Sequence, residues 1–518
     1  MKSNQTHQFS QIPKATIPRS RFNRSHGHKT TFDSGYLVPF YVDEALPGDT
    51  FKLKATIFGR LSTPIVPIMD NLFMDTFFFA VPIRLIWDNW QKFNGEQRNP
   101  GDSTDFLVPQ VNSIAGWDEG SIHDYFGLPI GIANLSVSAF HHRAYNLIYN
   151  EWFRDENLQS SVTVETGDGP DAIPYTLLKR NKRHDYFTSC LPWPQKGPGV
   201  ELPLGTTAPV IPITINAQPQ FKLSGDSAPA YLNSTAGVGN VIWDHTPPQN
   251  SSAGWMDPRL VADLSSASAA TINSLRQAFQ IQKLLERDAR GGTRYTELLR
   301  SHFGVTSPDS RLQRPEYLGG SSTRVNISAV AQTSETGTTT PQGNLAAFGT
   351  AGAHFHGFNK SFTEHCVIIG LVNLRADLSY QQGIRRMWSR RTRFDFYWPA
   401  LAHIGEQSVL NKEIYAQGTA TDENVFGYQE RWAEYRYFPS QITGRFRSNA
   451  TLPLDIWHLA QDFASLPSLN SSFITENPPL KRALAVQTEP EMIFDSYLSL
   501  NCARPMPIYS VPGLIDHF

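Results

Sequence analysis

The sequence contains little charge and few cysteines for its length. Only 18% of its 518 residues are Asp, Glu, Lys or Arg, whereas ordinary soluble domains have roughly 25%. Its three cysteines, Cys190, Cys366 and Cys502, lie far apart and form no CxxC pair, so a disulfide framework is disfavoured and a reducing compartment is expected. The chain lacks an apolar run of about 18 residues and an apolar N-terminal leader, so we expect neither membrane insertion nor a secretory signal.

Short catalytic signatures are absent as well. The sequence contains no HExxH metalloprotease motif, no phosphate-binding P-loop and no GxSxG nucleophile motif. No internal repeat is visible, which disfavours a solenoid or a propeller. We therefore expect a protein that is not an enzyme, with no catalytic residue, no metal ligand and no cofactor.

Aromatic and turn-forming residues are, by contrast, abundant. Phe, Trp and Tyr make up 12% of the chain, and Gly and Pro number 36 each. Gly and Pro in these numbers imply many turns, and the cores of subunit interfaces lose charge while they gain aromatic residues and Arg. These features favour an all-β body with extensive contacts between subunits.

The N-terminal segment is strongly basic, although the net charge of the chain is −2. Residues 1–32 contain six Lys or Arg and no Asp or Glu. Such a segment cannot bury enough apolar surface to fold alone, and it suits a polyanionic partner. We interpret residues 1–35 as a basic arm. Its residues expected to contact DNA are Lys14, Arg19, Arg21, Arg24 and Lys29.

Residues 36–518 are expected to form the β domain, with very long and partly helical loops. In residues 50–60 apolar Phe51 and Leu53 alternate with Lys52 and Lys54, and residues 72–82 are almost continuously apolar, which suits a strand covered on both faces. Strands are predicted over residues 36–44, 50–60, 72–82, 185–190, 324–332, 362–377, 390–398, 427–438 and 491–499. Helices are predicted over residues 84–93, 138–158, 270–290, 295–303 and 454–463.

The composition changes in residues 195–270, which are sparsely charged and rich in Pro, Gly, Ser, Thr and Asn. A connection of this length inside a compact fold is usually functional or disordered. Its short β-like pieces, such as residues 210–215, favour a small ordered surface insertion that interrupts the β domain.

Five long blocks of the chain resemble one protein family. They are residues 12–54, 64–82, 87–106, 284–320 and 360–415. In amino-acid sequence and in their order along the chain, they resemble the major capsid protein of small single-stranded DNA phages, the Microviridae, and specifically of the gokushovirus branch. The resemblance is weakest in residues 195–265.

This resemblance implies a fold and a role. The fold would be a single eight-stranded jelly roll, and sixty copies would close an icosahedral T=1 shell around a circular single-stranded DNA genome. The insertion at 195–270 would form protrusions at the threefold axes. The implied partners are an internal scaffolding protein, a DNA pilot protein, a small basic DNA-binding protein and a host cell-surface receptor. The implied location is the virion, with assembly in the host cytoplasm.

Two further groups of residues are candidates for recognition. A second basic cluster surrounds Trp388 without an acid between Asp377 and Asp395, and Arg beside an aromatic ring suits single-stranded DNA, although Arg is also preferred in interface ion pairs. Its proposed DNA contacts are Arg385, Arg386, Arg390 and Arg391. The proposed host-attachment residues, at a turn-rich loop tip, are Asn233, Ser234, Thr235 and Asn240.

A metal-dependent enzyme related to cupins is the alternative function. His354 and His356 stand two residues apart and would share one face of a strand, with Glu364 beyond them. Seven residues separate His356 from Glu364, where the cupin motif has three or four, so satisfied structural histidines are the simpler interpretation. The same interpretation applies to His141 and His142.

Overall fold

The computed structural model gives a mostly β-sheet protein with few helices, in two compact units. The units are residues 1–194 with 291–518, here called the main unit, and residues 195–290, here called the insert unit. The structure describes residues 18–200, 210–212, 219–234, 241–244, 246, 249, 252–257, 260–262, 272–305, 313–339 and 341–509.

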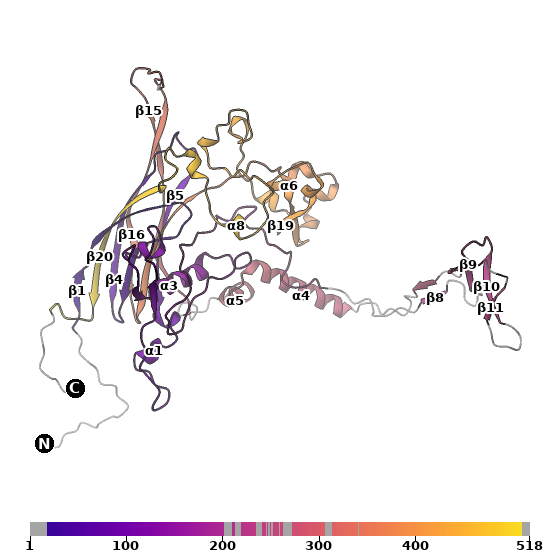
Figure 1. The fold of residues 1–518 in the computed structure, drawn as a ribbon, viewed down its shortest axis with the longest axis horizontal. Helices are drawn as coiled ribbons and strands as arrows, with labels where there is room; N and C mark the ends of the chain where they lie inside the picture. Colours follow the sequence, from indigo (N-terminus) through magenta and orange to yellow (C-terminus); the bar gives the residue numbers. More distant parts are fainter. Residues whose placement is uncertain are drawn as a thin grey trace. The chain divides into compact units, whose positions relative to one another are not determined.

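The first sheet of the main unit contains six antiparallel strands, and it brings together strands from the N-terminal and C-terminal parts of the described chain (Figure 1). The strand near the C-terminus pairs on one side with both strands of the N-terminal segment and on the other side with β4. The six strands are β1 (Ser20–Asn23), β2 (His26–Phe32), β4 (Thr50–Leu61), β15 (Asn326–Ala331), β16 (Leu345–Ser361) and β20 (Met492–Arg504).

The second sheet contains four antiparallel strands in the order β14-β5-β17-β3. These strands also come from distant parts of the chain, since the segment between β5 and β14 holds more than two hundred residues, roughly the size of a domain. The strands are β3 (Val38–Ala45), β5 (Leu72–Pro82), β14 (Glu316–Arg324) and β17 (Cys366–Ala376).

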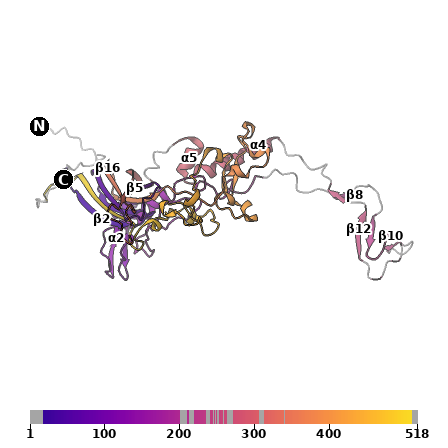
Figure 2. The same cartoon turned by 90° about the horizontal axis from the view of Figure 1, so that it is seen from above.

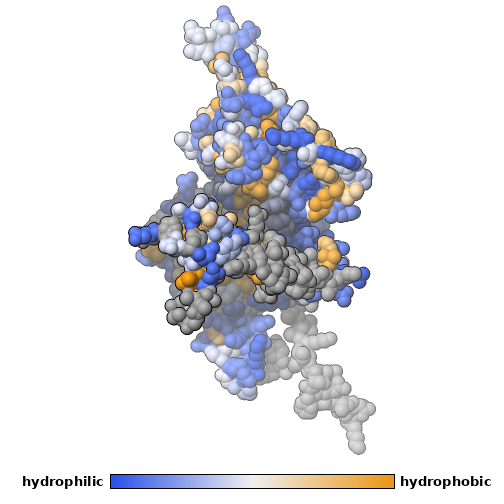
Figure 3. All heavy atoms as spheres, turned by 90° about the vertical axis from the view of Figure 1, so that its right-hand side faces the viewer, coloured by the Kyte–Doolittle hydropathy of each residue, from blue (hydrophilic) through white to orange (hydrophobic). Residues whose placement is uncertain are grey.

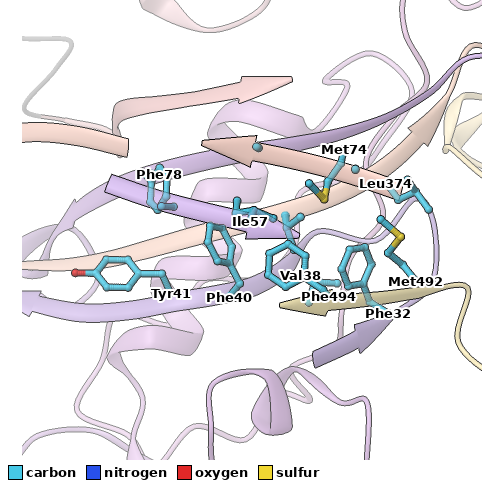
Figure 4. Packing of buried hydrophobic residues seen from close by; sticks show 14 of the residues in the cluster. Phe32, Val38, Phe40, Tyr41, Ile57, Met74, Phe78, Leu374, Met492 and Phe494 are labelled. Carbon is cyan, nitrogen blue, oxygen red and sulfur yellow. The ribbon is translucent and has the colours of Figure 1, made fainter. Parts of the chain in front are cut away.

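The two sheets pack face to face over the main core. Strand β4 alternates as predicted, with Phe51, Leu53 and Ala55 buried and Lys52 and Lys54 exposed. Burial of one such Phe or Leu side chain stabilises a fold by roughly 1.5–3 kcal/mol. Figure 4 shows side chains from both sheets meeting in this core. They include Phe32, Val38, Phe40, Tyr41, Ile57, Met74, Phe78, Leu374, Met492 and Phe494.

The other face of the second sheet is covered by a helix. Successive residues of β5 point alternately to the main core and to a second cluster around α3 (Phe140–Ile148), so Phe78 lies in the first and Phe79 in the second. The predicted strand covered on both faces is therefore confirmed. Helix α3 continues as a π-helical turn, η2 (Tyr149–Phe153), which leaves Trp152 37% exposed.

The remaining elements of the main unit are short. The strands form two small pairs, β6 (Gln110–Ser113) with β7 (Leu135–Ser138), and β18 (Glu406–Leu410) with β19 (Val425–Glu430). The α-helices are α1 (Trp90–Phe93), α2 (Ile122–Tyr125), α5 (Tyr295–Phe303), α6 (Asn411–Ile414), α7 (Ala433–Arg436) and α8 (Ser471–Ile474). The 3-10 turns are η1 (Ile83–Leu85), η4 (Arg386–Ser389), η5 (Arg393–Asp395), η6 (Pro399–Leu401), η7 (Ala420–Glu423), η8 (Gly444–Phe446), η9 (Asp455–Trp457) and η10 (Leu480–Ala483).

The insert unit holds its own small sheet, in the order β11-β10-β9-β12, and a separate strand pair, β8 with β13. Figures 1 and 2 both show the strands of the sheet gathered together. Phe221 packs edge-on against both Trp243 and Trp255. The elements are β8 (Val210–Pro212), β9 (Gln220–Leu223), β10 (Pro229–Ser234), β11 (Val241–Trp243), β12 (Ala253–Asp257), β13 (Leu260–Ala262) and α4 (Ile272–Gly291).

Several local predictions are wrong, because side chains override the apolar pattern. Residues 185–190 form a turn, since the Asp185 carboxylate accepts the N–H groups of Phe187 and Thr188. Residues 390–398 contain η5 in place of a strand, because Asp395 accepts the N–H groups of Arg391 and Thr392.

Longer helices were also predicted than the chain forms. Of residues 454–463, only Asp455–Trp457 are helical, and of residues 84–93 only η1 and α1 are. The predicted strand 427–438 ends at Glu430, where Trp432 adopts a positive φ of 70° and α7 begins. The helices predicted over 270–290 and 295–303 are confirmed as α4 and α5.

Candidate functional site

The described part of the basic arm is paired with the first sheet. Strand β1 runs antiparallel to β20 from Ser20 opposite Arg504, and β2 continues along the same strand from His26 opposite Leu498. Residues 20–32 cannot fold alone, as their composition suggests, but β20 supplies the backbone partner that they lack. Lys14 lies outside the described residues.

Some charges of this segment have partners within the chain. Arg24 donates two hydrogen bonds to the carboxylate of Asp43, at 2.7 and 2.9 Å. Lys29 lies 3.3 Å from Asp495 on the neighbouring strand. Arg19 donates to the carbonyl oxygen of Gly48 at 2.6 Å, and Arg21 is exposed on β1. Of the arm residues predicted to contact DNA, Arg24 therefore forms the strongest contact within the chain.

The second predicted cluster, residues 385–393, is here called the arginine run. Its central guanidinium groups bind acids of the same chain. Arg386 donates to the carbonyl oxygen of Ser408 at 2.6 Å and to the carboxylate of Glu413 at 3.0 Å. Arg390 lies 3.7 Å from Glu434, and both of these side chains are largely buried. A pairing of this kind is the structural role that Arg commonly has.

The other members of the arginine run lie against aromatic rings or line a hollow. The guanidinium of Arg385 is 3.6 Å from the centre of the Phe438 ring, and that of Arg393 is 4.6 Å from Trp398. Arg391 contributes to the wall of a cavity of about 460 Å³ that also contains Glu413 and Glu434. The structure thus brings the four predicted arginines together, but in an environment that already holds negative charge.

Exposed apolar side chains surround the arginine run. Trp388, Phe394 and Phe438 are 73%, 67% and 79% exposed. On the face of the molecule in Figure 3, hydrophobic residues (orange) lie between hydrophilic ones (blue). Large exposed rings of this kind are typical of surfaces that contact other molecules.

A third basic group, which the sequence analysis missed, forms a pocket on the second sheet. This cavity of about 430 Å³ is here called the basic aromatic pocket. Its aromatic wall consists of Phe77, Phe79, Trp152, Phe153 and Tyr317, and its polar wall consists of Arg180, Asn181, Lys182, Arg183, His184 and Arg375. The run KRNKRH at residues 179–184 is the signal in the sequence that could have indicated it.

Comparison with known proteins identifies the family. The family model described as "Capsid protein (F protein)" matches residues 10–514. The chain is 50% identical to capsid protein VP1 of Bdellovibrio phage phiMH2K, over 99% of this chain and 98% of that protein. It is 46% identical to capsid protein VP1 of Chlamydia phage 1 and 39% identical to that of Spiroplasma virus 4, over 98% of this chain and 97% of each relative.

The chain belongs to the phage F-type capsid protein family. The predicted relationship to the gokushovirus branch is confirmed by these relatives. The protein is a structural subunit of a phage capsid, and its place is the virion. Among the described residues, no helix is long and apolar enough to cross a membrane.

The capsid family leaves the cupin-like alternative without support. The geometry of the two histidines also argues against the metal chelate that this alternative would require. A register shift in β16 between Ala353 and His356 interrupts the alternation of side chains, so residues two apart no longer share one face of the sheet. His354 is consequently exposed, while His356 points inward and lies 3.3 Å from the hydroxyl of Thr76. The two rings face opposite sides of the sheet, and the described residues contain no group of three or more potential metal ligands.

Of His141 and His142, the other two histidines interpreted as structural, His142 is packed among the rings of His123, Phe126 and Tyr175. His142 Nε2 lies 2.9 Å from His123 Nδ1 in the second core cluster, and His123 stacks on Trp117. Burial lowers the pKa of His123 to about 4 and that of His142 to about 3, and the neighbouring His123 contributes to the latter. Both rings are therefore neutral at physiological pH.

The host-attachment candidates fall partly within the insert unit's sheet. Asn233 and Ser234 end β10, opposite Ile242 and Val241 of β11. Thr235 and Asn240 lie outside the described residues. Asn233 and Ser234 thus lie at the C-terminal end of β10.

Proposed function

We propose that the family's capsid role is carried by a single jelly roll in the main unit. The arrangement of eight strands supports this jelly roll, and we number them one to eight in chain order. They are β2, β3, β4, β5, β14, β16, β17 and β20. The sheet orders become 1-8-3-6 and 2-7-4-5, so the strands pair as first with last, second with seventh, third with sixth and fourth with fifth. A long antiparallel hairpin rolled into two sheets has this nested pairing, which jelly-roll capsid proteins use.

We infer that copies of this subunit close an icosahedral T=1 shell of sixty subunits around a circular single-stranded DNA genome. The observation that carries the proposal is the match to VP1 capsid proteins over nearly the whole chain. Exposed rings such as Trp388 and Phe438 would be covered by neighbouring subunits. Assembly would occur in the host cytoplasm with an internal scaffolding protein, and the DNA pilot and small DNA-binding proteins would join the particle.

Sedimentation and electron microscopy test the shell. The full chain is co-expressed with the other phage structural proteins, and the lysate is separated on a sucrose gradient. We expect closed particles of uniform size together with smaller subunit assemblies. Persistence of the chain as a monomer in every co-expression would contradict the proposed shell.

We propose that the arm faces the interior and contacts DNA. Arg19 and Arg21 are the best described candidates, because Arg24 is held by Asp43. Neutralising phosphates releases counterions, so binding should weaken steeply as salt rises. In the Arg19→Gln/Arg21→Gln variant we expect particles with less packaged DNA. The control is Lys481→Gln, which removes an exposed cation paired at 3.6 Å with Asp33. Equal DNA content in all three particles would remove the arm from DNA packaging.

We propose that residues 195–270, within the insert unit, form the threefold protrusion and carry host recognition at its tip. Its strands expose Val210, Val241 and Leu260, at 63%, 64% and 49%, and three copies packed together would cover such residues. Substituting Asn233 and Ser234 with Ala should reduce adsorption to the host and leave particle yield unchanged. Normal adsorption by these particles would leave the protrusion with a structural role alone.

A further inference from the structure

The basic aromatic pocket contains a buried guanidinium with two donor groups that lack hydrogen-bond partners among the described residues, one more than Arg390 of the arginine run. The side chain of Arg375 is only 4% exposed. Among the described residues, the carboxylate in ion-pair contact with Arg375 is that of Asp75, 3.5 Å from one terminal nitrogen, and the buried Glu476 attracts the guanidinium from a longer distance. The Nε and the second terminal nitrogen of Arg375 have no hydrogen-bond partner among the described residues. Burying charged donors in this state is costly, so a reason for keeping them is needed.

The position of Arg375 follows from strand register. Arg375 lies on β17, and Phe77 and Phe79 lie on the adjacent strand β5 with side chains on the same face of the sheet. Tyr317 on β14 stands opposite Phe79. The sheet therefore fixes a guanidinium and three rings on one rigid surface, and the π-helical turn η2 adds Trp152 above them.

The charge of the pocket is positive. No carboxylate lines it. Outside the lining of the pocket, Asp75 binds Arg180 at 2.6 Å, and Asp377 binds Arg183 at 3.0 Å. Each of these two acids is thus already taken by a guanidinium, and Arg375 shares Asp75 at the longer distance. The guanidinium of Arg375 therefore retains N–H donors for an anion that accepts several hydrogen bonds, as a phosphate does.

The aromatic wall selects among anions. Tyr317 and Trp152 are 42% and 37% exposed, although each packs against Phe79. Tyr317 is held by the sheet and Trp152 by η2, where the guanidinium of Arg314 lies 4.4 Å from the centre of the Trp152 ring. Rings that are fixed in this way and remain partly exposed suit flat, apolar partners, and a stacked nucleobase contributes roughly 1–3 kcal/mol by alanine substitution. A free phosphate ion would use only the guanidinium side of the cavity.

We propose that the basic aromatic pocket binds one nucleotide of single-stranded nucleic acid, with its phosphate on Arg375, Arg180 and Arg183 and its base against Tyr317 and Trp152. This inference rests on the proposed packaging of single-stranded DNA and names a site for it. The cavity of about 430 Å³ lies within the size range of sites that enclose small ligands.

Oligonucleotide binding to the purified full chain tests the site. The probe is a fluorescent oligothymidylate at low salt, and the variants are Arg375→Gln and Tyr317→Leu. We expect each to weaken binding by about tenfold. The matched controls are Arg436→Gln and Tyr497→Leu, which alter an exposed ion pair and a 54% exposed strand tyrosine outside the pocket. Both controls should bind as the unaltered chain does.

Photocrosslinking then locates the base. A thymidine analogue that crosslinks on illumination should attach to the peptides containing Trp152 or Tyr317, and should fail to do so in Tyr317→Leu. Circular dichroism and thermal unfolding establish that each variant is folded. If Arg375→Gln does not fold, Tyr317→Leu alone decides, because its side chain is accessible.

The outcomes separate this inference from the proposed function. If the unaltered chain binds DNA and both pocket variants bind equally well, the pocket is not the site, while DNA packaging stands. If Arg375→Gln weakens binding but Tyr317→Leu does not, and inorganic phosphate competes fully, the nucleotide is excluded in favour of an anion. If an acidic peptide displaces the probe at lower concentration than a nucleotide does, the partner is a protein and the inference is wrong. Particles of the unaltered protein that never contain DNA would overturn both proposals.

Discussion

The arginine run and the basic aromatic pocket use the same residue types in opposite ways. In the arginine run, Arg386 lies against Glu413 and Arg390 faces Glu434, so acids of the same chain take up the positive charge. In the pocket, Arg375 keeps two donors without partners among the described residues, and no acid lines the cavity. Arginine beside aromatic rings is common to both regions, so the distribution of nearby carboxylates is the observation on which our proposal distinguishes them.

The difference has an energetic counterpart. A satisfied buried ion pair is costly to break, because the remaining partner is left charged and unsolvated. An under-partnered buried cation already carries that cost in the native state, and binding sites commonly sacrifice stability in this way. Burial lowers the pKa of Arg375, and repulsion from Arg180 adds to the effect. The two regions should accordingly respond in opposite ways to loss of an arginine.

The largest effect is expected in the arginine run. Arg386→Ala should destabilise the main unit by about 3 kcal/mol, because the Glu413 carboxylate is only 3% exposed and loses its cation. Urea unfolding of the purified chain measures this change. The double variant Arg386→Ala/Glu413→Gln should recover part of the loss, since it removes the unpaired charge. An Arg386→Ala variant as stable as the unaltered chain would show that the pairing is not structural.

A smaller effect, dependent on pH, is expected at Glu476, a buried acid that interacts electrostatically with Arg375. Burial raises the pKa of Glu476 to about 7, although Arg375 opposes the shift. Because the folded state holds this proton more tightly than the unfolded state, stability should fall as pH rises from about 4.5 to 7, by on the order of 2–3 kcal/mol. Unfolding measured at pH 5 and pH 8 should show the fall in the unaltered chain and a smaller fall in Glu476→Gln. The same slope in both would mean that another group titrates.

Removal of the pocket's buried cation should change stability least among the buried groups. Arg375→Met is expected to shift the free energy of unfolding by no more than about 1 kcal/mol, because Asp75 keeps Arg180 at 2.6 Å. Comparison with Arg386→Met under the same conditions sharpens the contrast, since the substitution is chemically the same. A loss as large as that of Arg386→Met would make Arg375 a structural residue and would erase the distinction between the two regions.

An exposed pair sets the lower limit of the comparison. Arg436 and Glu430 form an ion pair with both side chains more than half exposed, at 52% and 54%. Exposed pairs contribute roughly 0.2–1 kcal/mol, so Arg436→Gln should change the urea midpoint least of all. A larger change than in Arg386→Ala would show that exposure does not rank these pairs.

The sequence alone determined the features that depend on local pattern and on similarity to a known family over long segments. Local pattern predicted the alternation in residues 50–60, the apolar run 72–82 and the helices α4 and α5. It did so because neighbours along the chain determine which face of an element is buried. The family was predicted from the five segments that resemble it, and the comparison with its relatives confirmed the prediction. Local pattern and sequence similarity together determined the β class and the capsid role.

Only the tertiary structure decided the features that depend on distant partners. Residues 20–32 become strands because β20, more than four hundred residues away, offers its edge. A single register shift in β16 separates His354 from His356, which no spacing rule anticipates. The pocket joins Arg180 to Arg375 and both to Asp75. Burial, and hence the cost of an unpaired charge, arises only when these segments meet, so the sequence shows where the arginines are but not which of them lacks a partner.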